Sequence, residues 1–265
     1  MLDQIQPGVW FSSKRYMLFV LILASPLSRP VLAFPLHRED VGRGRVMLGP
    51  SLEEIADPES VLTYNEIKTA GFHPVSSLFV HHGFTSSAWW YRFNYQAKDL
   101  QPGDRLMLSL FNVRLHHVSI WIEEPGKAVR RIDGGHRKPQ ASYYRDTVFR
   151  LPISDQTVTV YLRIFTYGPL RIMPALILDE KLHEEDFVRE WIYGVFTGSQ
   201  LVLAVLNLLI FFLLRDKNYL RFSLFAFSTT LTQLSINGYF SLHFALPWDI
   251  DLRLILVFGF PALYP

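Results

Sequence analysis

The residues best suited to bind a ligand lie in one aromatic stretch, W-W-Y-R-F-N-Y-Q, from Trp89 to Gln96. Side chains alternate between the two faces of a β-strand. Trp90 and Arg92 would then share one face, where an indole and a guanidinium can stack on a sugar ring and hydrogen-bond to it. The opposite face would be wholly aromatic, as a sandwich interior requires, and would consist of Trp89, Tyr91, Phe93 and Tyr95. A purely structural strand is the alternative for the whole stretch.

A second strand pattern runs from Val158 to Tyr167 and places an arginine among aromatic rings. Arg163 lies two positions from both Tyr161 and Phe165, opposite the apolar face of its strand. Planar hydrogen bonding and stacking by arginine suit anionic or hydroxyl-rich ligands, whereas the alternative is a solvated outer face. The same two interpretations, a ligand contact or a solvated outer face, apply to Trp121 on its own strand. The candidate ligand-binding residues are therefore Trp90, Arg92, Trp121, Arg163 and Tyr167.

The sequence contains no recognisable metal or catalytic motif. The pairs His81-His82 and His116-His117 each offer at most one ligand per strand face, and zinc needs three or four converging ligands. The chain has no cysteine, which excludes disulfides, iron–sulfur clusters and thiol catalysis. We therefore expect no metal, no cofactor and no catalytic residue, although the scattered carboxylates leave glycosidase chemistry open. A formal charge of +2 without a basic stripe also argues against nucleic acid.

The elements that must position these residues are short strands. Apolar residues alternate over 106–111, 118–122 and 158–167, and 170–178 adds a further apolar run. The turn sequences Q-P-G-D, E-P-G-K, D-G-G and Y-G-P separate these segments. Several short alternating strands with turns between them indicate an all-β, jelly-roll-like sandwich, which we expect over residues 34–184.

The last third of the chain is apolar. Residues 179–191 are charged and predict a helical connector, and residues 192–214 carry no charge over a length that spans a bilayer. A second uncharged run covers 222–246, and a third begins at 254 and is cut short by the end of the sequence. The region 185–265 is therefore expected to form transmembrane helices.

Two signals agree on the orientation of these helices. Residues 1–33 read as a secretory signal peptide, with a basic start, a short apolar run and small residues before a cleavage point after Ala33. An uncleaved anchor is the alternative, and either one would export the chain from residue 34 onward. The first span then ends in the cytoplasm, where the positive-inside rule favours its basic cluster, Arg215, Lys217 and Arg221. We expect a multi-pass protein of the inner membrane with its N-terminal domain in the periplasm.

Some residues inside the spans suggest helix packing. Gly194 and Gly198 form a G-x-x-x-G pattern, which lets two helix backbones approach closely inside a bundle or at a dimer seam. Polar side chains in hydrocarbon usually bridge helices, and those of Asn207, Gln233 and Asn237 are the candidates here.

The order of these parts resembles a known family. An exported sandwich with W-Y-R-F leads to Y-G-V-F-T-G, then R-D-K-N-Y-L and L-T-Q-L-S-I-N-G-Y-F. This resembles the bacterial seven-transmembrane receptors with diverse intracellular signalling modules (7TMR-DISM), over about residues 45–265 and most specifically over 215–238. In that family a periplasmic jelly-roll sensor precedes seven helices and a cytoplasmic output, such as a diguanylate cyclase or a histidine kinase. The sequence departs from the family by ending in the third helix, which leaves open whether the product signals alone, needs a partner or is a fragment.

The resemblance implies the sensor and transmembrane part of a signal-transduction receptor that binds a periplasmic ligand, a carbohydrate or a small anion, and that is not itself an enzyme. Two alternatives stay open. A membrane-anchored enzyme acting on glycans predicts two carboxylates across a concave face. A protein that docks a partner receptor, or a second copy of itself, predicts an exposed apolar patch.

Overall fold

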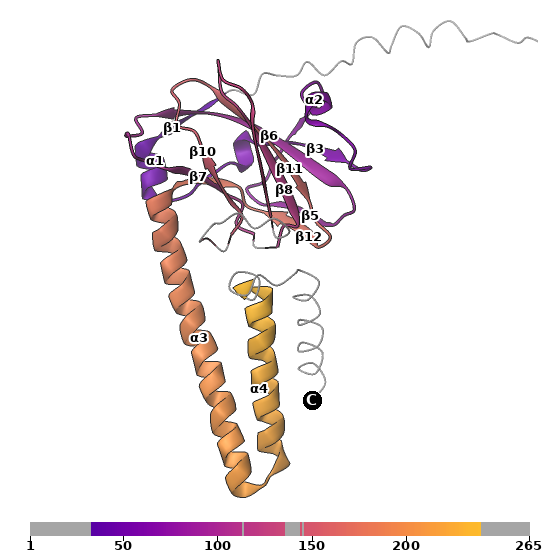
Figure 1. Ribbon diagram of the computed structural model, residues 1–265, viewed down its shortest axis with the longest axis vertical. Helices are drawn as coiled ribbons and strands as arrows, with labels where there is room; N and C mark the ends of the chain where they lie inside the picture. The colour runs from indigo at the N-terminus through magenta and orange to yellow at the C-terminus, as the bar shows by residue number, and fades with distance from the viewer. Residues whose placement is uncertain (1–32, 113, 136–143, 145, 240–265) are drawn as a thin grey trace, which may run out of the picture. The chain divides into compact units, whose positions relative to one another are not determined.

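The chain forms a β-sandwich and then two long helices (Figure 1). The structure, a computed structural model, describes residues 33–112, 114–135, 144 and 146–239. The expected signal peptide, apart from Ala33, and the third apolar run lie outside the described residues.

The larger sheet has seven strands in the order β4-β3-β6-β11-β8-β9, with β1 pairing in parallel to β6. All other neighbours in this sheet are antiparallel. The strands are β1 (Phe34–His37), β3 (Glu53–Asp57), β4 (His73–Pro74), β6 (Ala88–Lys98), β8 (His117–Glu123), β9 (Arg130–Gly134) and β11 (Val158–Phe165).

The second layer is a four-stranded sheet in the order β10-β7-β13-β2. Its strands are β2 (Val46–Met47), β7 (Leu106–Ser109), β10 (Val148–Leu151) and β13 (Ala175–Leu178). A two-stranded sheet pairs β12 (Pro169–Ile172) with β5 (Val80–Phe84). The expected single run 170–178 is thus divided between two sheets at Met173-Pro174, because proline cannot donate to a strand ladder. The short helices are α1 (Arg38–Arg43), α2 (Tyr64–Ile67) and the 3-10 turn η1 (Gly49–Ser51).

The core between the layers confirms the predicted alternation along β6. Tyr91, Phe93 and Tyr95 are all 0% exposed, and Trp89 packs against the same cluster. Alternate residues of β11 and β7 complete this core. Each fully buried aromatic side chain contributes about 2–3 kcal/mol, so this cluster is a main source of the domain's stability.

The connector and the first apolar span form one helix. α3 (Asp179–Leu214) begins directly after β13 and is the one helix among the described residues that is long and apolar enough to span a membrane, by length and composition. Arg215 turns the chain with φ 57°, and the Asp216 carboxylate accepts the Asn218 backbone N–H at the start of α4 (Lys217–Ile236). The expected second span, 222–246, begins in α4 and extends beyond the described residues.

Short hydroxyl side chains join α3 to α4. Ser223 donates to the Ala204 carbonyl at 2.8 Å, and Thr230 donates to the Gln200 amide oxygen at 3.0 Å. Ala204 and Ala226 are also almost fully buried, so the two helices meet through small residues.

The five residues expected to pack helices do not supply these bonds. The amides of Asn207 and Asn237 donate to carbonyls of their own helices, in the latter case to that of Gln233. Gly194 and Gly198 are exposed, and no atom of another described element lies within 4 Å of where a Cβ would be. The donors that join the helices are thus hydroxyls, and their acceptors are the Ala204 carbonyl and the Gln200 side-chain amide.

Candidate functional site

Four of the predicted ligand residues gather on the outer face of the larger sheet. The strands β6, β11 and β8 are neighbours, with Trp90 paired to Arg163, and with Arg92 and Trp121 both paired to Tyr161. Tyr167 does not join this group. It follows the end of β11, is 56% exposed, and packs edge-on against Phe165 and His116.

The shared face carries a layer of aromatic rings. Trp90 and Trp121 stack with their ring centroids 5.0 Å apart, and Tyr161 belongs to the same cluster. Their exposures are only 1%, 9% and 5%, respectively. The expectation of an open platform at Trp90 is therefore corrected, since other parts of the chain cover its ring. Sequence alternation placed it on the right face but could not show what lies above it.

The covering element is the segment 61–72, called here the cover segment, which connects β3 to β4 and contains α2 (Figure 1). Ile67 is its anchor, with 0% exposure. Further side chains that pack on the aromatic layer from this segment are Leu62, Tyr64, Ala70 and Phe72. Tyrosine, isoleucine and phenylalanine thus hide a sheet face that would otherwise expose indoles to water.

The cover segment is held at its first residues. The buried Asp57 carboxylate accepts the backbone N–H groups of Val61 and Leu62 at 3.2 and 3.1 Å. Thr63 and Glu66 then form a capping box for α2. Its sequence signal, T-Y-N-E, matches the pattern of a helix start and could have located this turn. The position of the turn over the sheet has no such local signal.

Tyr64 makes the closest ring contact with the layer. Its ring lies parallel to that of Trp121, with an interplanar angle of 6° and centroids 5.5 Å apart. The Tyr64 hydroxyl donates to the Glu123 carboxylate, which also pairs with Lys68 at 2.6 Å. Burial, followed by this bond to a carboxylate, raises the pKa of the Tyr64 hydroxyl well above its ordinary value. Tyr64 therefore stays a proton donor at any physiological pH.

The two predicted arginines already have partners within the chain. Arg92 Nε lies 2.9 Å from the Glu53 carboxylate, and its guanidinium carbon lies 4.4 Å from the centre of the Phe72 ring. Arg163 donates to the Ser60 carbonyl at 2.9 Å. Arg92 thus links β6 to β3 and to Phe72 of the cover segment, and Arg163 links β11 to the turn between β3 and the cover segment.

The arrangement combines flat apolar rings with an acceptor and several cations at its edge. Such a site can hold a ring through stacking and fix its hydroxyl groups by hydrogen bonds. Over the ranges that the structure describes, no three His, Cys, Asp or Glu residues come together in a way that could hold a metal ion. His82 instead pairs with Glu54, and His116 bonds to Thr166.

The sandwich and the first turns of α3 are joined by buried and charged side chains. Leu182 is 0% exposed and packs with Val148 and Ile177. Arg189 lies 3.0 Å from the Asp146 carboxylate, whose side chain is only 4% exposed. Two further hydrogen bonds hold α3 on the sandwich: Arg45 donates to Glu185, and the Tyr144 hydroxyl donates to Asp179.

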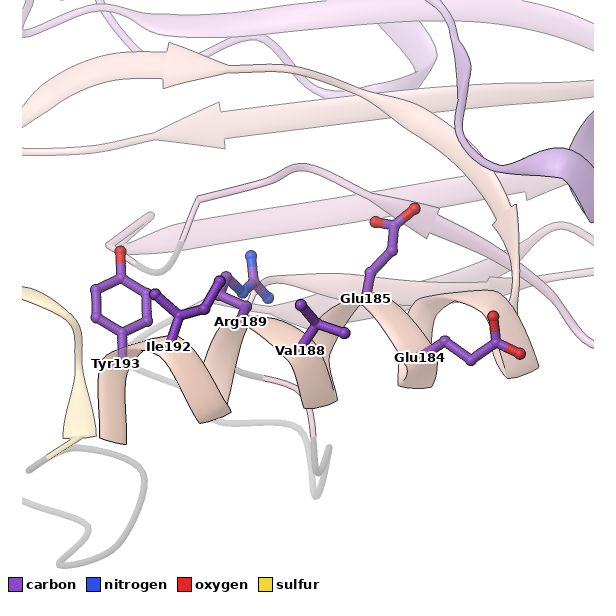
Figure 2. Close-up of a pocket in the computed structure, with 6 residues that line it drawn as sticks. All are labelled: Glu184, Glu185, Val188, Arg189, Ile192 and Tyr193. Carbon is purple, nitrogen blue, oxygen red and sulfur yellow. The ribbon is translucent and has the colours of Figure 1, made fainter. Parts of the chain in front are cut away.

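Figure 2 shows Glu185, Arg189 and Tyr193 projecting from one side of the same helix. They line a hollow along the first turns of α3, together with Glu184, Val188 and Ile192. The sequence indicated a charged connector, but its partners come from distant loops and could not be found from the connector itself.

Two family models match the chain. The one described as 7TMR-DISM extracellular 2 covers residues 49–177, and the one described as 7TM diverse intracellular signalling covers residues 189–264. Neither description is of a catalytic domain. The docked turns of α3 lie at the boundary between the two matches. A comparison with curated proteins found no match.

Two solved structures show a distant likeness. One is TmCBM61 in complex with β-1,4-galactotriose, at 8% identity and a TM-score of 0.30, covering 49% of this chain and 90% of that one. The other is CsCBM6-3 from Clostridium stercorarium in complex with cellobiose, at 13% identity and a TM-score of 0.20, covering 39% of this chain and 82% of that one. Both scores are low, and neither likeness bears on the ligand of this chain.

Proposed function

Because this chain belongs to the 7TMR-DISM family of membrane receptors, we propose that its sandwich senses a carbohydrate and that α3 carries the response into the membrane. Membership of this family indicates a membrane protein with an extracellular or periplasmic sensor domain. The ligand class, the binding face and the route of transmission are the proposal.

The observation that carries the proposal is the continuity of α3. Its first turns are docked on the sandwich by Leu182 and Arg189, and the same helix continues without a break to Leu214. A rigid element shared by both parts can transmit a shift of one to the other, provided that the ligand favours one of two arrangements of the joint.

The outer face of the larger sheet supports a carbohydrate as the ligand. Trp121 and Trp90 supply broad apolar rings, and Glu123 supplies an acceptor for hydroxyl donors. Aromatic side chains with an adjacent polar group suit a ring that is apolar on its faces and polar at its edge.

The expected export signal and the basic turn support a periplasmic sensor and helices in the inner membrane. The basic residues Arg215, Lys217 and Arg221 follow the first span, where they would face the cytoplasm. We infer a multi-pass arrangement whose response reaches a cytoplasmic output module, as the family resemblance implies.

A ligand titration of the whole chain in detergent tests the proposal. Sugars, such as methyl β-D-glucopyranoside, and small carboxylates, such as succinate, are compared by calorimetry and by thermal shift. A ligand at a hundred times its Kd should raise the unfolding free energy by about 2.7 kcal/mol. If no compound binds while the chain forms a stable dimer or hetero-complex, the docking alternative replaces the sensor.

Matched variants then locate the site. Trp121→Leu keeps an apolar side chain but removes the stacking ring, and we expect binding to weaken about tenfold, which is roughly 1.4 kcal/mol. Tyr167→Leu is the control, because Tyr167 lies outside the aromatic cluster and is already exposed. Equal losses in both variants, or none in either, would place the ligand elsewhere.

A further inference from the structure

We propose that Tyr64 occupies the position of the ligand ring on Trp121, and that the cover segment must lift before a neutral sugar can bind there. This inference rests on the proposed function and deepens it. It identifies the site as closed by its own chain in the ligand-free protein.

The contacts of Tyr64 are those that a ligand ring would make. It stacks on Trp121 at an interplanar angle of 6°, meets Tyr161 edge-on at 86°, and donates a hydroxyl hydrogen to Glu123. A pyranose presents an apolar face and hydroxyl groups at its edge, so it can replace both the stacking and the hydrogen bond.

The Glu123 carboxylate, which accepts the Tyr64 hydroxyl, selects the class of ligand. Glu123 accepts hydrogen bonds but has none to donate when ionised. A neutral sugar offers hydroxyl donors to it, whereas a ligand carboxylate would meet a like charge. At the position of the Tyr64 hydroxyl, Glu123 therefore favours a sugar hydroxyl over a ligand carboxylate.

One polar atom in this layer independently points to a missing partner. Trp90 is 1% exposed, and its indole N–H has no hydrogen-bond partner in the described part of the chain. A buried tryptophan N–H normally has an acceptor, and leaving one without a partner costs about 1–3 kcal/mol. A sugar hydroxyl that enters the layer can accept this hydrogen.

The cover segment can leave without breaking the sheet. Among the described residues, the backbone N–H groups of the cover segment donate either within the segment, as Ile67 does to the Thr63 carbonyl, or to the Asp57 carboxylate. The strands on either side of it, β3 and β4, remain paired to each other through Glu53 and Pro74. Only side-chain contacts hold the segment on the aromatic layer.

A hinge is available at the start of the cover segment. Ser60 has φ 58°, a left-handed conformation that is uncommon for a residue with a side chain. Its carbonyl accepts from Arg163, and its hydroxyl accepts the Ala88 backbone N–H at 3.0 Å. Together with the bonds from Val61 and Leu62 to the Asp57 carboxylate, these bonds fix the hinge to the sheet while the residues after Leu62 move.

The absence of cysteine in the sequence allows a direct test of opening without any ligand. Ile67→Cys places a thiol under the cover, and Ile120→Cys places one in the main core; both native side chains are 0% exposed. In the whole chain in detergent, we expect iodoacetamide to modify the I67C variant at least ten times faster than I120C, because local opening needs less free energy than global unfolding. Equal rates would overturn the proposal.

Hydrogen exchange of the wild-type chain replaces this comparison if either variant fails to fold. The Ile67 amide, which bonds to the Thr63 carbonyl, should exchange at least ten times faster than the Ile120 amide in β8. Exchange of both amides only by global unfolding would again reject a movable cover.

The ligand arm uses methyl β-D-glucopyranoside, methyl β-D-galactopyranoside and succinate. Tyr64→Ala removes the competing ring and should bind at least one sugar about tenfold more tightly than the wild type, Tyr64→Phe should gain less, and succinate should not gain. Tyr167→Ala serves as the control.

If the wild type binds a sugar that Tyr64→Ala binds no better, Tyr64 does not hold the ligand's place, although the proposed function stands. If no sugar binds either protein, the proposed function fails, and the claim of a sugar site fails with it.

Discussion

Removing the Arg189 guanidinium should uncouple α3 from the sandwich. Arg189 lies 3.0 Å from Asp146, and the exposed fractions of the two side chains are 18% and 4%. Arg189→Met keeps an apolar stem but leaves the buried Asp146 carboxylate without its cation, and it also removes the pair with Asp186 on the same helix. Breaking a buried pair in this way costs about 3–5 kcal/mol, and we expect the lower end because the arginine is partly exposed.

The assay is thermal unfolding of the whole chain in detergent, followed by tryptophan fluorescence. A loss of about 3 kcal/mol should lower the Tm of the sandwich by roughly 10 °C for a domain of about 150 residues. Lys181→Met is the control on the same helix, since its pair with Glu184 is solvent-exposed and should shift the Tm by less than about 2 °C.

A double-mutant cycle with Asp146→Asn decides whether the pair itself is responsible. Asparagine removes the charge that Arg189 compensates, so the double variant should recover much of the stability lost in Arg189→Met. A coupling free energy below about 0.5 kcal/mol, or an Arg189→Met Tm within about 2 °C of the wild type, would refute this account of the joint.

Two further predictions concern the tyrosines and the helix pair. Burial raises the pKa of Tyr64, Tyr91 and Tyr95 above the ordinary value of about 10, so the unfolded chain loses these protons above pH 10 while the folded sandwich keeps them. The contribution of these tyrosines to the unfolding free energy should therefore be constant below pH 10 and fall above it, and Tyr64→Phe should make the fall shallower in denaturant titrations; an unchanged slope would contradict the burial of this hydroxyl. Thr230→Val removes the bond to Gln200 and should weaken α3–α4 packing by about 0.6 kcal/mol in detergent unfolding, whereas Thr232→Val, which loses only a bond within α4, should change it less. Equal effects would show that Thr230 does not join the helices.

Local periodicity was enough to predict which β6 residues face the core. Tyr91, Phe93 and Tyr95 are all fully buried in the main cluster, as an alternation of two requires. The same argument put Trp90 and Arg92 on the opposite face, where the structure has them. These predictions succeed because the direction of a strand side chain depends only on its own backbone.

Helix contacts are harder to predict from the sequence, because they concern pairs of elements. The charge-free run 192–214 is enough to indicate a helix, and α3 covers it. The residues that join α3 to α4 are hydroxyls, Ser223 and Thr230, rather than the amides of Asn207 or Asn237. Which face of a helix meets its neighbour depends on the turn at Arg215 and on close backbone approach, and neither can be read from residue type.

By itself the sequence determined that an all-β domain precedes apolar helices and that one strand has an aromatic inner face, since periodicity and hydrophobic length are properties of single segments. The tertiary structure was needed to show that the second aromatic face is covered by residues 61–72 and that Tyr64 stacks on Trp121. It also decided that Arg189 meets Asp146, a partner 43 positions away. Such contacts form when loops are brought together by the packing of two sheets, and no local pattern encodes that distance.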